Sequence, residues 1–173
     1  GMCTASCAPS TSTGTPRPWA MRTTCRMGTT VPRTFDMCVM ATTGKNGPIA
    51  SPIEYYADGL DLYMLPDPGT PKLKALQRDP RISVAVHGAY HGWHSARGAQ
   101  IFGRAEIIEP HAPGWDRGMQ IFRWHEWMSD LAMDTSKPFE RQVLKVVPDR
   151  ILYTETWLWK LGFGAKQKWL RQG

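Results

Sequence analysis

The stretch Arg81–His87, RISVAVH, constrains the fold of this 173-residue chain more than any other. Its apolar residues Ile82, Val84 and Val86 are separated by single small residues. Because successive side chains of a strand point to opposite faces, this alternation puts the three apolar side chains on one face. The stretch therefore predicts a β-strand with one buried face, within a sheet whose two sides differ.

Further strands are predicted on both sides of this one, each ended by Gly, Pro or Asn residues. They cover residues 37–43, 48–56, 60–66, 99–108 and 141–155. The sequence GKNG at 44–47 predicts a hairpin between the first two. Pro52 indicates that the second strand is an edge strand or contains a bulge, and Pro148 predicts that the last segment is broken into a strand pair.

Two helices are predicted among these strands. A short one begins at Pro71, with Thr70 as its N-cap, and ends before Pro80. A longer amphipathic helix covers 115–132, with Met119, Phe122, Trp127 and Leu131 among its apolar positions. Antiparallel strands with these two helices predict a mainly β domain of the α+β class, folded as a closed or partly closed barrel.

Charge and composition divide the chain into three parts. Residues 1–33 are rich in Ser, Thr, Pro and Gly, contain four arginines and no acidic residue, and are predicted to form an irregular N-terminal arm. We assign residues 34–156 to the barrel domain and 157–173 to a basic, aromatic C-terminal tail. All 15 Asp and Glu residues lie between 34 and 159, so the net charge of +6 comes from the two ends. Such arms could bind nucleic acid or wrap a partner subunit, and we do not expect nucleic acid to be the ligand.

No apolar run approaches the roughly 18 residues that a membrane span requires. The first residues also lack the apolar core of a signal peptide. We therefore expect a cytoplasmic protein that does not bind membranes.

The tetrad Gly69-Thr70-Pro71-Lys72 is the best candidate for a binding site. The first amides of a helix have no partners within the helix, and the helix dipole attracts anions to that end. Thr70 adds a hydroxyl and Lys72 a positive charge, which together could hold a phosphate. The alternative is that Thr70 only caps the helix and Lys72 is solvated.

Histidines and cysteines offer a weaker pattern. His87, His91 and His94 are spaced across a predicted loop, where imidazoles could bind a metal or haem, but surface histidines are the simpler interpretation. The four cysteines, Cys3, Cys7, Cys25 and Cys38, do not have the spacing of a zinc site. We therefore predict reduced thiols and no metal site.

Three segments in this order, MATTGKNGPIASPIEYYADG, GTPKLKALQRDPRISVAV and RGAQIFGRAEII, resemble the pyridoxamine 5'-phosphate oxidase-like, FMN-binding split-barrel family. That family's pattern is a strand ending in Ala-Thr, a Gly turn, Pro-x-x-Ser-Pro, Ser/Thr-x-Lys and Asn/Asp-Pro-Arg. The resemblance covers about residues 37–110.

This resemblance implies a six-stranded antiparallel Greek-key split β-barrel with flanking helices, forming a homodimer with FMN at the subunit interface. It also implies which residues contact the flavin. These are Ala50, Ser51, Pro52 and Ile53 on the strand along the flavin, Tyr63 and Met64 near the ribityl phosphate, Thr70 and Lys72 at the phosphate, and Gln100 near the ring system.

The resemblance implies an FMN-dependent oxidoreductase, for which no catalytic side chain is predicted because the flavin transfers the hydride or electrons. The C-terminal KLGFGAKQKWLRQG lacks the Arg/His motif that binds substrate phosphate in true pyridoxamine 5'-phosphate oxidases, so that reaction is not implied. One alternative is a haem-binding or haem-degrading protein on the same barrel, with His87, His91 or His94 as the ligand. Another is a non-enzymatic module that binds nucleic acid through its arms. The substrate and the electron donor are not predicted.

Overall fold

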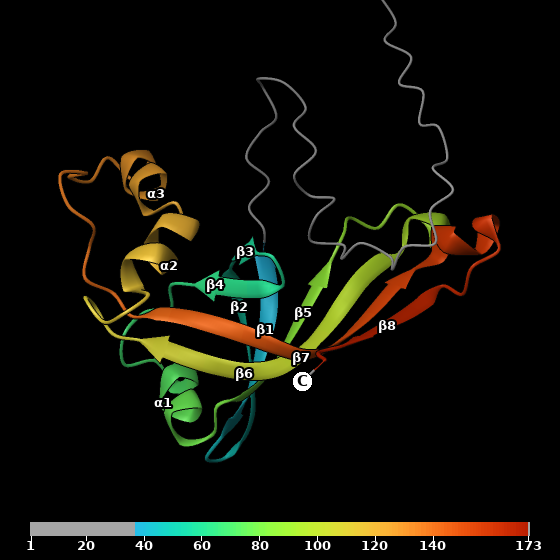
Figure 1. The fold of residues 1–173 in the computed structure, drawn as a ribbon, viewed down its shortest axis with the longest axis horizontal. Coiled ribbons are helices and arrows are strands. Elements are labelled where there is room, and N and C mark those ends of the chain that lie inside the picture. Colours follow the sequence, from blue (N-terminus) through green and yellow to red (C-terminus); the bar gives the residue numbers. More distant parts are fainter. Residues whose placement is uncertain (1–36, 173) are drawn as a thin grey trace, which may run out of the picture.

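In the computed structural model, which describes residues 37–172, antiparallel strands form one curled sheet with helices beside it (Figure 1). The strands are β1 (Met37–Gly44), β2 (Gly47–Glu54), β3 (Tyr56–Asp58), β4 (Asp61–Met64), β5 (Arg81–His87), β6 (Arg97–Ile108), β7 (Val143–Glu155) and β8 (Lys166–Leu170). The helices are α1 (Pro71–Arg78), α2 (Trp115–Ile121) and α3 (Trp124–Asp130), with 3₁₀ helices at Trp93–Ser95 and Thr156–Leu161. The strand order is β2-β1-β5-β6-β7-β4-β3, and β8 pairs with β7.

This sheet confirms the predicted split-barrel class. β2 lies at one edge, as Pro52 indicates, and pairs with β1 through the hairpin predicted at 44–47. The described sheet has eight strands where the family resemblance implies six. The short β3 is separated from β2 at Tyr55, and β8 comes from residues 157–173, which were assigned to a separate tail.

The long strands β6 and β7 form the centre of the sheet (Figure 1). Their pairing shifts register at Phe102/Gly103, so Asp149 has no partner in the β6 register and bulges out. The predicted break at Pro148 is therefore a bulge within one strand of 13 residues, not a boundary between two strands. Gly103 allows this close approach, because a Cβ there would lie 2.1 Å from Val147 O.

The single helix predicted for residues 115–132 is wrong. Arg123 has a φ of 60°, which ends α2 and starts α3 in a new direction, and its guanidinium bonds Glu126 in the first turn of α3. Met119 and Phe122 are buried as predicted, whereas Leu131 is 55% exposed. An apolar pattern that fits one long helix also fits two short ones, because each needs only one buried stripe.

The main core lies on the inner face of the sheet. It includes Met40, Val84, Ile101 and Ile151 from four different strands, and Leu76 of α1. A second cluster packs α2 against another part of the sheet and contains Tyr63, Trp115, Met119 and Val143.

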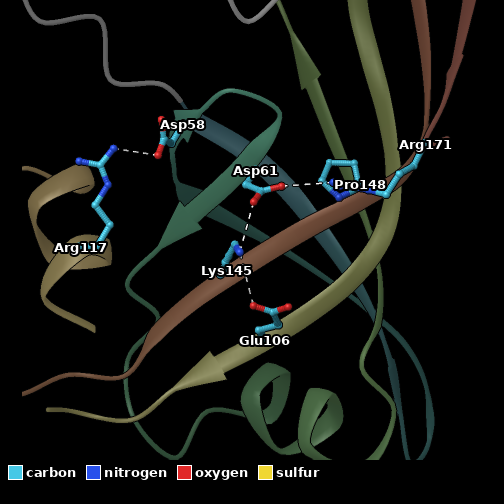
Figure 2. A network of polar contacts seen from close by, with 7 residues as sticks. All are labelled: Asp58, Asp61, Glu106, Arg117, Lys145, Pro148 and Arg171. Atoms are coloured by element: carbon cyan, nitrogen blue, oxygen red, sulfur yellow. Dashed lines mark hydrogen bonds and ion pairs between the residues drawn. The ribbon is translucent and has the colours of Figure 1, made fainter. Parts of the chain in front are cut away.

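A polar network fastens the C-terminal end of the chain to the sheet (Figure 2). Lys145 of β7 lies between Asp61 of β4 and Glu106 of β6, with its Nζ 3.2 Å and 3.6 Å from their carboxylate oxygens. Arg171, just after β8, donates from Nε to Pro148 O at the bulge, at 2.8 Å, and lies 3.4 Å from Asp61. The end of the tail is thus part of the folded domain.

None of the helices among residues 37–172 is both long and apolar enough to cross a bilayer. The predicted N-terminal arm, 1–33, and three of the four cysteines, Cys3, Cys7 and Cys25, lie outside the described residues.

Candidate functional site

The strand register brings residues from six strands into one line on the outer face of the sheet. Residues directly opposite each other in neighbouring strands point to the same face. The register pairs therefore define an outward row: Pro52, Val39, Ala85, Gln100, Leu152 and Lys168. Two of the residues that the family resemblance assigns to the flavin, Pro52 and Gln100, belong to this row.

The predicted flavin residues of β2 divide between the two faces. Ala50 and Pro52 are exposed on the outer face, as the period of two requires. Ser51 is opposite Met40, which is buried in the core, so Ser51 points inward. Ile53 is buried in the same core. On a single protomer, only Ala50 and Pro52 of these four are open to a ligand on the outer face.

Thr70 occupies the N-cap position of α1, but its hydroxyl does not cap the helix. The hydroxyl donates instead to Asp67 O at 2.9 Å. The N-terminus of α1 consequently has no side-chain cap, while Pro71 starts the helix and Lys74 N donates to Thr70 O at 3.1 Å. The Thr70 hydroxyl therefore does not cap the helix, as the simpler interpretation of this tetrad requires.

Lys72 lies beside the strand pair that carries the β2 residues. Burial raises the pKa of the Cys38 thiol to about 12, and the nearby charge of Lys72 partly opposes this shift. Cys38 is opposite Ile53 in the β1–β2 register, and its thiol donates to Ile53 O at 3.4 Å. Thr70 and Lys72 thus lie at a helix start next to β1 and β2.

A cavity of about 390 Å³ separates α1 from the β1–β2 hairpin turn. It is lined by residues 44–49 together with Pro71, Lys74 and Arg78. Lys74 lines this cavity and Lys72 does not, so the two lysines of α1 lie in different environments.

Tyr63 and Met64 are not on the outer face with Pro52 and Gln100. Met64 is completely buried in the main core, and Tyr63 packs with Trp115 and Met119 of α2. Burial raises the pKa of the Tyr63 hydroxyl, which keeps it neutral. Tyr63 and Met64 therefore contribute to the packing of the core, and they do not lie beside Pro52 and Gln100.

A second cavity, of about 470 Å³, contains Gln100. It is lined by three residues from each of four strands: 85–87 of β5, 98–100 of β6, 152–154 of β7 and 166–168 of β8. Sequence reasoning missed the contributions of Lys166 and Lys168. In the sequence these two lysines stand out only as part of a basic tail, and no local pattern indicates that this segment pairs with β7.

The three candidate ligand histidines do not form a metal site. His87, His91 and His94 are all exposed, and His87 Nδ1 lies 3.1 Å from the carbonyl of Gly88. Within residues 37–172, no group of three or more His, Cys, Asp and Glu side chains could hold a metal ion. Cys38 is a free, buried thiol.

Comparison with known proteins identifies the family of this chain. The family model described as pyridoxamine 5'-phosphate oxidase matches residues 30–155. The chain therefore belongs to the pyridoxamine 5'-phosphate oxidase family, and the split-barrel resemblance noted in its sequence is confirmed. Among curated proteins, none matches this chain.

Solved structures with the same fold differ in the cofactor that they bind. A pyridoxamine 5'-phosphate oxidase-related, FMN-binding protein from Nostoc punctiforme is 17% identical, with a TM-score of 0.55 over 78% of this chain and 79% of its own. A FAD-binding protein from Mesorhizobium loti is 16% identical, with a TM-score of 0.53 over 67% and 81%. A heme-binding protein from Mycobacterium smegmatis is 17% identical, with a TM-score of 0.57 over 79% and 53%. At these identities the likeness shows the fold alone.

Proposed function

We propose that this protein is an FMN-binding flavoprotein and acts as a flavin-dependent oxidoreductase. The family to which it belongs supports a flavin, and the FMN-binding relative from Nostoc punctiforme supports FMN. The proposal includes a homodimer with the flavin at the subunit interface and a cytoplasmic location. It does not include oxidation of pyridoxamine 5'-phosphate, because residues 160–173 do not match the Arg/His motif that the resemblance associates with that substrate.

The observation that carries this proposal is the start of α1. Its first amides have no side-chain cap, since the Thr70 hydroxyl bonds Asp67 O instead. An uncapped helix N-terminus attracts anions, and Lys72 adds a positive charge within the first turn. These groups suit the phosphate that distinguishes FMN from riboflavin.

α1 packs against the inner face through Leu76, so the ring of a flavin shared at a dimer interface would lie on the outer face of the other protomer, and that face suits it. Ala50, Pro52 and Val39 form a surface of small or apolar side chains, and Gln100 adds an amide that can both donate and accept hydrogen bonds. When bound, FMN would supply hydride or electron transfer, and the protein would bind and orient it.

The test is a titration of the purified apoprotein with FMN and riboflavin, followed by the quenching of flavin fluorescence. A charge-assisted hydrogen bond contributes about 1.5–3 kcal/mol, so Lys72→Ala should weaken FMN binding roughly 10- to 150-fold. Riboflavin affinity should hardly change, because riboflavin has no phosphate. Lys74→Ala is the matched control, since Lys74 faces the cavity beside the hairpin, and it should matter less.

Equal FMN affinity in the parent and Lys72→Ala would contradict the phosphate site. An equal loss of FMN and riboflavin would show that the substitution damages the fold rather than the phosphate contact.

Haem is the second candidate, and one observation favours it. His87 lines the same cavity as Gln100, and Nδ1 must carry the hydrogen in its contact with Gly88 O, so Nε2 is the nitrogen left to bind iron. The absorption spectrum separates the two: bound flavin gives two bands in the near-ultraviolet and blue, whereas haem gives a single intense Soret band. Loss of the Soret band in His87→Ala would assign the ligand.

A further inference from the structure

The cavity that contains Gln100 has a wall that the resemblance to the family did not include. This wall is β8, which places Lys166 and Lys168 opposite Thr154 and Leu152 of β7. Two residues apart on one strand, the lysines project from the same face about 7 Å from each other. Both are exposed.

The charge of this cavity has one sign. None of its lining residues is acidic, and Lys166 and Lys168 are its two fixed cations. Within residues 37–172, neither lysine forms an ion pair. Their positive charges are therefore available to a ligand that enters the cavity.

The floor of the cavity consists of small and apolar side chains. Gly98 has no side chain, and a Cβ there would lie 2.7 Å from Val86 O, so the strands approach closely at this point. Ala85 and Leu152 continue the floor on the neighbouring strands, with Thr154 and Gln100 as hydrogen-bonding groups. A surface of this kind fits the face of a planar ring, and the cavity's volume of about 470 Å³ lies within the usual range for small-ligand sites.

We propose that this cavity is a binding site for a small planar anion, such as an aromatic carboxylate, with the ring on the floor of Ala85, Gly98 and Leu152 and the carboxylate at Lys166 and Lys168. The inference rests on the proposed function in one respect: Gln100 adjoins the cavity, so the ligand would be a substrate held beside the flavin. The binding site itself requires only the described strands.

The test uses the full-length apoprotein and isothermal titration calorimetry with two probes, naphthoate and the isosteric, uncharged naphthamide. The parent should bind naphthoate saturably and more tightly than naphthamide. The double variant Lys166→Gln, Lys168→Gln should weaken naphthoate binding about tenfold, the factor that corresponds to the loss of one charge-assisted hydrogen bond. Its naphthamide affinity should be unchanged.

Lys137→Gln is the control, because Lys137 is an exposed lysine between α3 and β7 and does not line this cavity. It should bind naphthoate like the parent. Circular dichroism of each variant verifies that β8 is still folded. A second variant, Gly98→Val, fills the floor and should abolish binding of both probes, although the crowding at Val86 O requires that its folding be checked in the same way.

The inference is overturned if the parent binds naphthoate and naphthamide equally, if neither binds saturably, or if the double variant matches the parent. Competitive displacement of naphthoate by FMN would also overturn it, because the two ligands would then share one site. Naphthoate binding in a protein that fails to bind any flavin would support this site and contradict the proposed function, so the two proposals fail separately.

Discussion

Lys145 of β7 and Asp61 of β4 form an ion pair of 3.2 Å in which both side chains are only about a quarter exposed, at 24% and 27%. Burial of Lys145 by itself would lower its pKa, but the hydrogen bond and charge of Asp61, together with the charge of Glu106, outweigh this and raise the pKa. Arg171 approaches the same carboxylate (Figure 2). One carboxylate thus holds a central strand and the C-terminal end of the chain.

Asp61→Ala should therefore destabilise the protein by about 1 kcal/mol, the upper end for partly exposed ion pairs, because it removes the partner of two cations. The free energy of unfolding in urea measures this. Asp58→Ala is the matched control. Its pair with Arg117 is 48% and 63% exposed, so its loss should be at most about 0.5 kcal/mol. Equal losses in the two variants would show that the network around Lys145 adds no stability.

Gly103→Ala should destabilise the protein by about 2–3 kcal/mol. Its new Cβ would lie 2.1 Å from Val147 O and 2.8 Å from Pro148 Cα, and backbone atoms at the bulge cannot move aside as a side-chain end can. Gly164→Ala provides the comparison, because its Cβ would meet nothing closer than 3.8 Å. We expect a shift of about 0.5 kcal/mol or less for that variant. Urea unfolding of both variants distinguishes a bulge that requires glycine from one that tolerates alanine.

Cys38 should be unreactive in the folded protein. Alkylation requires the thiolate, and a pKa raised to about 12 leaves roughly one thiolate per ten thousand thiols at about pH 8. In a variant with Ser at Cys3, Cys7 and Cys25, iodoacetamide should label the native protein far more slowly than the urea-unfolded protein, and labelling should rise with pH. Mass spectrometry measures the labelled fraction, and rapid native labelling near neutral pH would mean that Cys38 is not buried as described.

The strands were predictable because their cause is local. The alternation at Ile82, Val84 and Val86 requires a sheet with one buried face whatever surrounds it, and the turn at 44–47 determines the β1–β2 pairing. The division at Arg123 was not predictable, because a non-glycine residue at positive φ leaves no mark in an apolar pattern.

The candidate site was predictable only in part, since it depends on pairing between distant segments. The tetrad at Thr70 and Lys72 is contiguous, so its chemistry could be proposed from its residues alone. The cavity at Gln100 needs β5, β6, β7 and β8 together, and β8 pairs with a strand more than ten residues earlier in the chain. A segment of mixed charge and aromatic residues gives no local signal for that pairing.

The outward row leads to the last prediction, which concerns the homodimer. Val39 is 40% exposed in this row, between Pro52 of the edge strand and Ala85, and Met37 on the same strand is 50% exposed. Neighbouring exposed apolar side chains on one face of a sheet form the kind of patch that marks a partner surface. We therefore expect Val39→Lys to convert a dimer into a monomer, because a dimer would bury an unpaired charge at the centre of its interface. Sedimentation velocity at micromolar concentration measures the change.

Leu131→Lys is the control: Leu131 is 55% exposed at the end of α3, away from the outward row, and its substitution should leave the dimer intact. A parent that sediments as a monomer, or a Val39→Lys variant that remains dimeric, would place the interface elsewhere or remove it.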